Sequence, residues 1–201
     1  MAVYIIGGSP CSGKSTIASA LSERYGLHYF KVDDHLDRYL KLGTTDKKPC
    51  CMKIGCMTSE QIWMRDPLVQ CDEELLIYEE IFDYVMADLE KADCKEGVIT
   101  EGAAYLPMLA SNAGIPVNRY ISLTPTKAFQ VHHYRKREWV PYVLADCSDK
   151  EKAFANWMDR DALFAKAVQQ QCNALGYASV IHDGQMTQEE LMALVAVHFE
   201  L

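Results

Sequence analysis

The sequence predicts a layered α/β domain built around a mainly parallel β-sheet. Three observations predict this class. Short segments rich in β-branched and aromatic residues alternate along the chain with longer segments of helical periodicity. Glycine, proline or a capping residue marks most boundaries between the two kinds of segment. A glycine- and serine-rich loop joins the first apolar segment to the first helical one, as a strand-to-helix turn requires.

Five apolar segments are predicted to form the strands. The first, 3–7, reads VYIIG and ends at a glycine, and the third, 97–101, reads GVITE. The fourth reads RYISL at 119–123, and the second and fifth cover 28–32 and 178–181. Because helical patterns lie between these strands, we expect them to pair in parallel.

Helical patterns follow the strands. The first predicted helix covers 15–25, and shorter ones are predicted at 36–40 and 106–113. Asp66-Pro67 predicts the start of a long helix, with Asp as the N-cap and proline in the first helical position. Its apolar stripe, which we assign to core packing, consists of Leu68, Cys71, Leu75, Tyr78, Phe82, Val85 and Leu89.

Later helices are predicted from their N-terminal caps. Thr124-Pro125 repeats the cap-plus-proline signal and predicts a helix that runs toward Trp139. Capping-box patterns precede the last two helices, at Ser148 with Glu151 and at Thr187 with Glu190. By contrast, 43–57 is a polar segment that we predict to be a mobile loop or insert. The sequence has no repeat, low-complexity tract or linker, and residues 1–201 are therefore expected to form a single domain.

The composition disfavours membrane proteins and proteins that bind polynucleotides. The chain has 201 residues and a net charge of −8, without a block of Lys and Arg to hold a nucleic-acid polymer. No signal peptide is evident, and charges interrupt every apolar stretch before the roughly 20 residues of a membrane span. Eight scattered cysteines indicate free thiols in a reducing cytoplasm. Cys50, Cys51 and Cys56 lack paired CxxC spacing, so that we favour ordinary thiols there, with metal binding left open.

The loop after the first strand matches the P-loop pattern in full. Its residues are Gly8, Ser9, Pro10, Cys11, Ser12, Gly13, Lys14, Ser15 and Thr16. The glycines let backbone N–H groups turn toward a phosphate, and the helix N-terminus adds partial positive charge. Lys14 can reach the outer phosphates of a nucleotide, and the Ser15 hydroxyl can bind Mg²⁺. The motif therefore predicts nucleotide binding, and the same helix terminus is expected to favour a thiolate at Cys11.

With this motif, the chain resembles the P-loop kinases that phosphorylate small metabolites, such as shikimate, gluconate, nucleoside and nucleotide kinases and chloramphenicol phosphotransferase. The resemblance extends over the architecture of nearly the whole chain and is specific in motif at 3–16, about 30–37 and 98–102. It implies a three-layer α/β/α domain whose parallel sheet has the order 2-3-1-4-5, with ATP and Mg²⁺ as ligands. It also implies an acceptor-side insert at about 43–66 and a lid at about 134–160.

Three acidic residues end predicted strands. Asp33 and Asp34 follow the second strand, where related kinases commonly place an acid that meets the acceptor hydroxyl or the metal. A carboxylate there can orient the hydroxyl and take its proton during phosphoryl transfer, and a helix cap is the alternative role. Glu101 ends the third strand, where an acid can hold Mg²⁺ through water. An exposed acid without such a role is the alternative for Glu101.

One basic residue is a candidate for the acceptor side. Arg65 precedes the long helix, and its guanidinium is suited to hold a carboxylate or phosphate of an anionic acceptor. A surface ion pair with Asp66 or Glu60 is the alternative.

The lid contains three candidate arginines for stabilising the charge of the transferred phosphoryl group. They are Arg135, Arg137 and Arg160. A solvated helix face is the alternative for the first two, and an ion pair with Asp159 or Asp161 is the alternative for Arg160.

Together these features predict a cytoplasmic kinase that transfers the γ-phosphoryl group of ATP to a small hydroxylated metabolite, for which an anion is one candidate class. Lys14 would hold the phosphates, Ser15 and Glu101 the Mg²⁺, and Asp33 or Asp34 the acceptor hydroxyl. The alternative is a regulatory module that binds or hydrolyses ATP without a small-molecule acceptor. A GTPase is disfavoured, because the sequence has no NKxD-type motif. We expect a monomer or homodimer, with neither a nucleic-acid polymer nor a membrane as partner.

Overall fold

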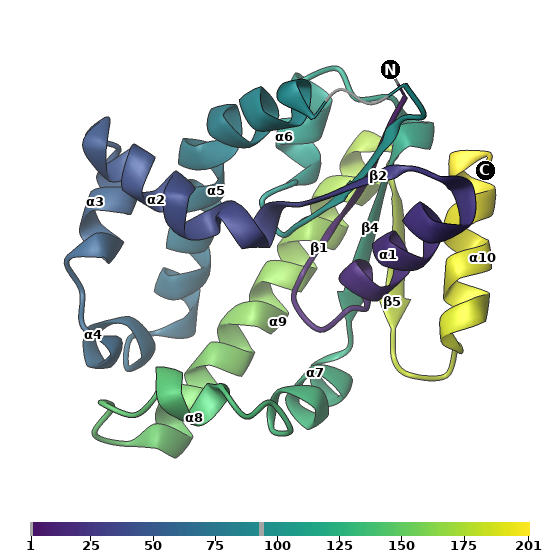
Figure 1. Cartoon of the computed structure of the whole chain (residues 1–201). Helices are drawn as coiled ribbons and strands as arrows, with labels where there is room; N and C mark the ends of the chain where they lie inside the picture. The colour runs from purple at the N-terminus through teal and green to yellow at the C-terminus, as the bar shows by residue number, and fades with distance from the viewer. Residues whose placement is uncertain (1, 93–94) are drawn as a thin grey trace.

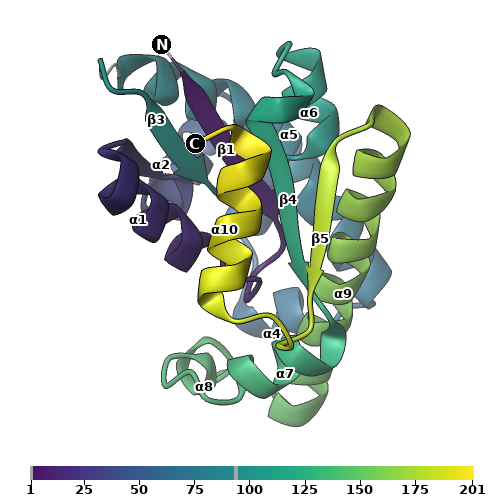
Figure 2. The ribbon, with the colours of Figure 1, turned by 90° about the vertical axis from the view of Figure 1, so that its right-hand side faces the viewer.

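Parallel strands form a five-stranded sheet in the order β2-β3-β1-β4-β5, which confirms the predicted order. The strands are β1 (Val3–Gly8), β2 (His28–Lys31), β3 (Val98–Glu101), β4 (Tyr120–Pro125) and β5 (Ala178–His182). This computed structural model describes residues 2–92 and 95–201, and Cys94, one of the predicted free thiols, lies outside the described residues. The carboxyl ends of the strands point toward the lower part of the views in Figures 1 and 2.

Helices cover both faces of the sheet and confirm the three-layer class (Figures 1 and 2). One face is covered by α1 (Lys14–Tyr25) and α10 (Gln188–Phe199), and the other by α5 (Pro67–Lys91), α6 (Pro107–Asn112) and α9 (Lys150–Leu175). Further helices are α2 (Leu36–Thr45), α3 (Pro49–Gly55), α4 (Ser59–Trp63), α7 (Lys127–Tyr134) and α8 (Val140–Val143), with 3₁₀ turns η1 (Val32–His35) and η2 (Val117–Arg119). Among the described residues, no helix combines the length and the apolar character needed to cross a membrane.

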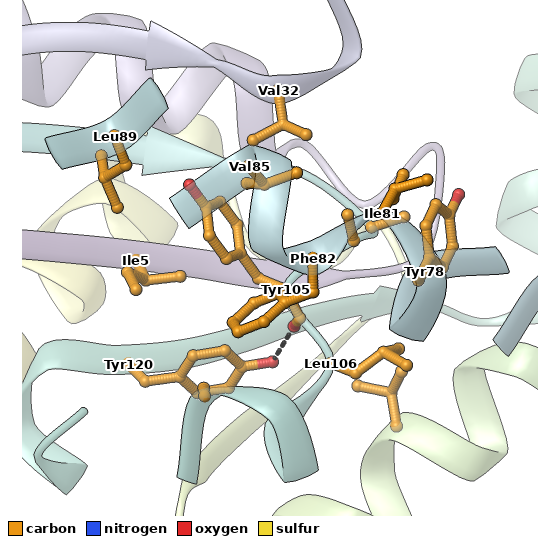
Figure 3. Close-up of a cluster of buried hydrophobic side chains, with 14 of the residues drawn as sticks. Ile5, Val32, Tyr78, Ile81, Phe82, Val85, Leu89, Tyr105, Leu106 and Tyr120 are labelled. Carbon is orange, nitrogen blue, oxygen red and sulfur yellow. Dashed lines mark hydrogen bonds between the residues drawn. The ribbon is translucent and has the colours of Figure 1, made fainter. Parts of the chain in front are cut away.

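The alternation of side chains along β1 divides the core between the two faces of the sheet. Tyr4 and Ile6 pack with α1 and α10, whereas Ile5 belongs to the cluster under α5 and α6 (Figure 3). In that cluster the Tyr120 hydroxyl donates a hydrogen bond of 2.7 Å to the backbone carbonyl of Tyr105 (Figure 3). Because apolar side chains cover both faces, the ends of the strands are where polar chemistry is expected.

Two of the predicted caps are confirmed, and one is displaced by a strand. Asp66 caps α5, and Thr187 forms the predicted capping box at the start of α10. Thr124 and Pro125 belong to β4, where they pair with β5, and the prediction of a helix start there is wrong. Thr126 is the cap of α7 instead.

The predicted capping box of Ser148 with Glu151 is also wrong. Asp149 caps α9 by accepting a hydrogen bond of 3.0 Å from the backbone N–H of Lys152. Ser148 donates instead to the carboxylate of Glu60, from its backbone N–H at 2.8 Å and from its hydroxyl at 2.7 Å. A contact with the insert therefore takes Ser148 away from the helix that follows it.

The segment 43–57, predicted to be a mobile loop, is largely helical. It contains the end of α2 and all of α3, and a capping box at Thr58 begins α4. The carboxylate of Glu80 in α5 accepts hydrogen bonds of 2.8 Å from the backbone N–H groups of Cys50 and Cys51. The N-terminus of α3 is thus capped by a distant helix, which the polar composition of the segment could not reveal.

The long helix α5 buries most of its predicted stripe. Cys71, Tyr78, Phe82, Val85 and Leu89 are buried, and Leu75 is partly buried against the same core. Leu68 differs from the prediction, because its side chain in the first turn is 58% exposed.

The segments predicted to be the insert and the lid pack against each other through aromatic side chains. Trp63 at the end of α4 stacks on Trp157 of α9, with 4.3 Å between the ring centroids. The side-chain amide of Asn156 donates a hydrogen bond of 3.0 Å to the backbone carbonyl of Trp63. Tyr134 and Phe154 join Trp157 in a separate small core under the lid. The insert therefore lies directly beside the segment that carries the lid arginines.

Candidate active site

The loop between β1 and α1 has the backbone geometry of a phosphate-binding loop. Gly8 has a φ of +116°, and a Cβ there would lie 1.9 Å from the carbonyl oxygen of Leu123, so that a larger residue does not fit. Gly13, with φ +89°, occupies the N-cap of α1 and offers no side chain to the first N–H groups of the helix. These N–H groups are therefore available to an anion at the helix N-terminus.

Lys14 is held inside this loop near two acids. Its Nζ donates a hydrogen bond of 2.7 Å to the backbone carbonyl of Ser9, and its side chain is buried. Burial lowers the pKa of Lys14, while the negative charges of Glu101 and Asp33 act against that shift. The hydroxyls of Ser9 and Ser12 are buried without a hydrogen-bond partner among the described residues. A bound phosphate would supply acceptors to these hydroxyls and to the ammonium group.

Glu101 is the acceptor for two hydroxyls at the end of β3. The Ser15 hydroxyl donates to Glu101 Oε1 over 2.9 Å, and the Tyr29 hydroxyl donates to the same atom over 3.0 Å. The Glu101 side chain is 0% exposed, and its Oε2 has no hydrogen-bond partner in the described part of the chain. Burial, followed by the charge of Glu101, raises the pKa of Tyr29, which remains a neutral donor. The alternative of an exposed acid is thereby excluded for Glu101.

The oxygen atoms of Ser15 and Glu101 fit a Mg²⁺ ion. Mg²⁺ prefers hard oxygen ligands and is usually held by one or two protein carboxylates together with substrate phosphates and water. Within residues 2–92 and 95–201, no group of three or more His, Cys, Asp or Glu side chains is placed to hold a metal. Sequence analysis missed Tyr29. A signal for it exists, because Lys31 lies beside Glu101 in the pairing of β2 with β3, and Tyr29, two positions earlier, is on the same face of the strand.

A cavity of about 340 Å³ opens beside the loop, and an acid and a guanidinium line it together with the loop. Its walls are residues 10–16, Lys31, Asp33 and Arg137. Asp34 differs from its neighbour, because it forms an ion pair of 2.9 Å with Lys31 and its side chain is 62% exposed. The N-cap of α2 makes no side-chain hydrogen bond, so that neither acid caps that helix. The two acids therefore have different surroundings, and Asp33 faces the loop.

Two of the lid arginines also have different surroundings, one at the cavity and one in an ion pair. Arg137 lines the cavity and lies over the rings of Tyr134 and Trp139, at 4.9 and 5.5 Å from their centroids. Arg135 forms an ion pair of 3.1 Å with Glu151 and is not part of the cavity wall. Arg137 is thus the lid arginine that the fold brings to the phosphate-binding loop.

The third lid arginine, Arg160, is buried and forms two ion pairs. Its guanidinium pairs with Glu74 of α5 and, through Nε at 2.6 Å, with Asp161. Asp161 also accepts a hydrogen bond of 2.7 Å from the side-chain amide of Gln130. Burial raises the pKa of Asp161, and the charge of Arg160 opposes that shift. The alternative given for Arg160, an ion pair with Asp159 or Asp161, is therefore confirmed, and its partner in sequence is Asp161.

A second cavity, of about 480 Å³, begins at the same loop and ends between aromatic rings. Phe129, His133 and His182 line its far side, with the Phe129 ring centroid 4.1 Å from that of His133 and 4.6 Å from that of His182. Four residues line both cavities: Cys11, Gly13, Thr16 and Arg137. The aromatic wall and the adjoining phosphate loop suit the base and the phosphates of one nucleotide. Sequence analysis missed Phe129, which lies in the first turn of α7.

The thiolate expected at Cys11 is not supported by its surroundings. Burial raises the pKa of the Cys11 thiol, although Arg137 nearby acts in the opposite direction. Cys11 packs against the small core under the lid, which partly buries its side chain. This burial acts against the thiolate that the helix N-terminus would favour.

A third cavity, of about 270 Å³, lies among α2, α3, α4 and α5. Its apolar walls are formed by Leu36, Leu40, Ile54, Ile62, Trp63 and Ile77. Arg65 also lines this cavity, but its guanidinium pairs with Glu73, which pairs with Lys53 as well. The alternative partners that the sequence suggested are engaged elsewhere, because Asp66 caps α5 and Glu60 binds Ser148.

A family model matches this chain, and the solved structures that resemble it include three proteins of similar length. The model, described as IPT, isopentenyl transferase, matches residues 1–112 of the 201, which include the loop, the insert and β3. A candidate kinase from Chloroflexus aurantiacus is 16% identical with a TM-score of 0.42, over 98% of this chain and 97% of that chain. The YorR protein from Bacillus subtilis, solved in complex with phosphorylated GDP, is 12% identical with a TM-score of 0.46, over 99% and 96%. A Thermus thermophilus protein is 16% identical with a TM-score of 0.48, over 100% and 97%.

Proposed function

The chain belongs to the isopentenyl transferase family, and from this premise we propose that it is a nucleotide-dependent transferase. The reaction that its cavities support best is Mg²⁺-dependent transfer of the γ-phosphoryl group of ATP to a hydroxyl group of a small metabolite. One observation supports this reaction: Asp33 and Arg137 line the same cavity as the phosphate-binding loop. An acid can take the proton of an acceptor hydroxyl, and a guanidinium can stabilise the charge of a transferred phosphoryl group.

The cavities of about 480 and 340 Å³ adjoin, so that one ATP molecule can extend through both. The adenine would lie against Phe129 and His182 in the larger cavity, and the phosphates would follow the loop. Lys14 would exchange its hydrogen bond to the Ser9 carbonyl for the outer phosphates. The unpartnered hydroxyls of Ser9 and Ser12 are further donors for phosphate oxygens.

Ser15 and Glu101 are the residues that would hold Mg²⁺. When bound there, the ion would supply positive charge to the phosphates. Tyr29 shares the acceptor oxygen of Glu101 with Ser15 and so restricts the orientation of the carboxylate.

In the transfer step, the acceptor oxygen forms a bond to the γ-phosphorus and the bond from that phosphorus to the β,γ-bridging oxygen breaks. Asp33 accepts the proton that leaves the acceptor hydroxyl, and ADP departs with the bridging oxygen. Arg137 stabilises the negative charge spread over the transferred group. The setting we propose is the cytoplasm, because the seven described cysteines are free thiols, as a reducing compartment maintains them.

The test uses ATP labelled at the γ-phosphate, with the small-molecule fraction of a cell extract as acceptor pool. We expect a labelled organic phosphate whose formation requires Mg²⁺ and is lost in the Asp33→Asn variant. Label that appears only as inorganic phosphate would instead support the regulatory, ATP-hydrolysing module that the sequence left as the alternative.

Isopentenyl transfer is the second candidate, and the family match over residues 1–112 favours it. In that reaction, dimethylallyl diphosphate would place two phosphates at the same loop. A nucleophilic atom of the acceptor nucleotide would form a bond to C1 of the prenyl group as the carbon–oxygen bond breaks, diphosphate would leave, and Asp33 would take the proton lost by the acceptor. Incubation with isopentenyl or dimethylallyl diphosphate and a nucleotide distinguishes the two reactions by mass spectrometry. A product heavier by one isopentenyl unit with release of diphosphate would favour this candidate over phosphoryl transfer.

A further inference from the structure

The third cavity shares no lining residue with the cavity that contains Asp33, but its wall begins within one helical turn of that acid. Leu36, on its wall, follows Asp33 by three positions, across the turn from η1 into α2. Tyr78, also on its wall, is buried, and after burial the charge of Asp33 is the next cause that raises the Tyr78 pKa. A molecule in the third cavity would therefore lie near the acid that we assign to the acceptor hydroxyl, on the side of Leu36 and Tyr78.

The charged side chains of the third cavity neutralise one another. Arg65 pairs with Glu73, and Arg160 pairs with Glu74. The Tyr78 hydroxyl donates a further hydrogen bond of 2.8 Å to Glu74. The cavity lining therefore contains two cations and two anions, and each cation is already paired with an anion.

We propose that this cavity binds the phosphoryl acceptor, and that the acceptor is an uncharged molecule with a compact apolar body and a hydroxyl group directed at Asp33. The role of the ligand as phosphoryl acceptor rests on the proposed phosphoryl transfer, whereas its chemical class follows from the cavity alone. Six apolar side chains form the walls, and the volume of about 270 Å³ suits a substituted ring, since about 150 Å³ accommodates benzene.

An anionic acceptor, one candidate class in the sequence, would have to compete with Glu73 for Arg65. Burial acts against the charged form of Glu73, but hydrogen bonds from Lys53 and Arg65 outweigh it and lower its pKa. At neutral pH, Glu73 is therefore charged and already forms an ion pair with the Arg65 guanidinium. An uncharged ligand leaves that pair intact.

The first experiment compares three probes of one shape in the absence of ATP. Benzyl alcohol, benzoate and benzylamine are tested for binding by saturation-transfer NMR. We expect benzyl alcohol to bind and the two charged probes to bind at least tenfold more weakly. Ile77→Phe fills the cavity and should abolish the signal, whereas Leu76→Phe, at the exposed neighbouring position on α5, should retain it. Stronger binding of benzoate, or no binding of benzyl alcohol, would overturn the proposal.

The second experiment reverses the charge selectivity. Glu73→Gln leaves Arg65 and Lys53 without their shared anion, so that benzoate should bind at least tenfold more tightly than to the unaltered protein. Glu79→Gln removes one charge from an exposed position of the same helix and should leave benzoate binding unchanged. Unchanged benzoate affinity in the Glu73→Gln protein would contradict the charge assignment.

The two proposals fail in different ways. If benzyl alcohol binds as expected but no labelled organic phosphate forms from ATP, phosphoryl transfer is wrong and the ligand class of the cavity stands. If labelled product forms but its acceptor is an anion whose binding is insensitive to Ile77→Phe, the transfer stands and the cavity assignment is wrong.

Discussion

The hydroxyl of Ser15 donates a hydrogen bond of 2.9 Å to Glu101, although 86 residues separate them in the chain. The sheet brings them together, because β1 and β3 are neighbours and Ile6 lies beside Glu101 in their register. The loop that follows β1 therefore begins next to the acid that ends β3. Two candidate Mg²⁺ ligands are in contact before any metal binds.

Replacement of Glu101 by Gln should weaken Mg²⁺ binding while the fold is retained. Gln can still accept the Ser15 hydrogen bond, but it lacks the charge that attracts the ion. We expect the Mg²⁺ concentration for half-maximal thermal stabilisation by ATP to rise by about tenfold or more. Asp34→Asn, which removes an exposed acid near the same strand ends, is the control and should leave the titration unchanged.

Lys14→Ala should abolish stabilisation by ATP. The side chain donates a hydrogen bond within the loop, to the backbone carbonyl of Ser9, and its removal takes away a charge-assisted contact to phosphate. The ATP-free melting temperature should change little compared with the loss of the ATP-induced shift, measured by differential scanning fluorimetry. A Lys14→Ala protein stabilised by ATP as well as the unaltered protein would contradict the role of the loop.

Asp33→Asn should slow phosphoryl transfer, whereas Asp34→Asn should leave its rate nearly unchanged. Asp33 faces the loop, so its Asn variant should bind ATP normally and transfer the phosphoryl group about 10²–10⁴-fold more slowly. Asp34 pairs with Lys31 at the surface, which contributes about 1 kcal/mol or less, and its variant should be nearly silent. Single-turnover rates at saturating ATP check both. A silent Asp33→Asn variant would move the proton acceptor elsewhere, and Glu101 is the first alternative.

Arg137→Ala should slow transfer much more than Arg135→Ala. The first variant removes a guanidinium from the cavity wall, whereas the second removes a surface pair with Glu151. We expect a loss of at least tenfold for Arg137→Ala in kcat, with little change for Arg135→Ala. Equal rates for the two variants would place the stabilising charge outside the lid.

Glu80→Gln should destabilise the protein in a pH-dependent manner. Burial acts against the charged form, but hydrogen bonds from the backbone of Cys50 and Cys51 outweigh it, so that the folded-state pKa of Glu80 lies below 4.5. The stabilisation is therefore present above pH 4.5 and is lost as the pH falls through the lower folded-state value.

At pH 7 we expect the Glu80→Gln variant to lose about 1 kcal/mol of unfolding free energy, because one of two capping bonds is lost. Urea unfolding across the acidic range should show the two proteins converging once Glu80 is protonated. The adjacent exposed variant Glu79→Gln controls for the loss of a charge on α5, and a constant difference at all pH values would contradict the cap.

Several parts of the site could be predicted because their signals are local. The loop 8–16 and the caps at Asp66 and Thr187 depend on residues within a few positions of one another, and the structure has all three. Asp33 and Glu101 were found because parallel strands direct their carboxyl ends to one edge of the sheet. The strand order came from the resemblance to P-loop kinases, since no local pattern encodes it.

Other predictions were wrong where a distant partner replaced the local one. The segment 43–57 lacks a strong helical pattern, and α3 depends on Glu80, which lies 30 positions from Cys50. Ser148 has a capping-box spacing to Glu151 but binds Glu60 across 88 positions. In both cases the deciding contact is one that a short stretch of sequence does not contain.

By itself, the sequence determined a phosphate-binding loop and the acids beside it, because these depend on backbone turns and strand ends that neighbouring residues define. Only the tertiary structure decided which arginines remain available to a substrate. Arg65 and Arg160 pair with acids of α5, whereas Arg137 faces the loop. The pair of Arg160 with Glu74 spans 86 positions, and it forms because α9 packs against α5. Ion pairing depends on distance in space and on burial, which the packing of the helices sets.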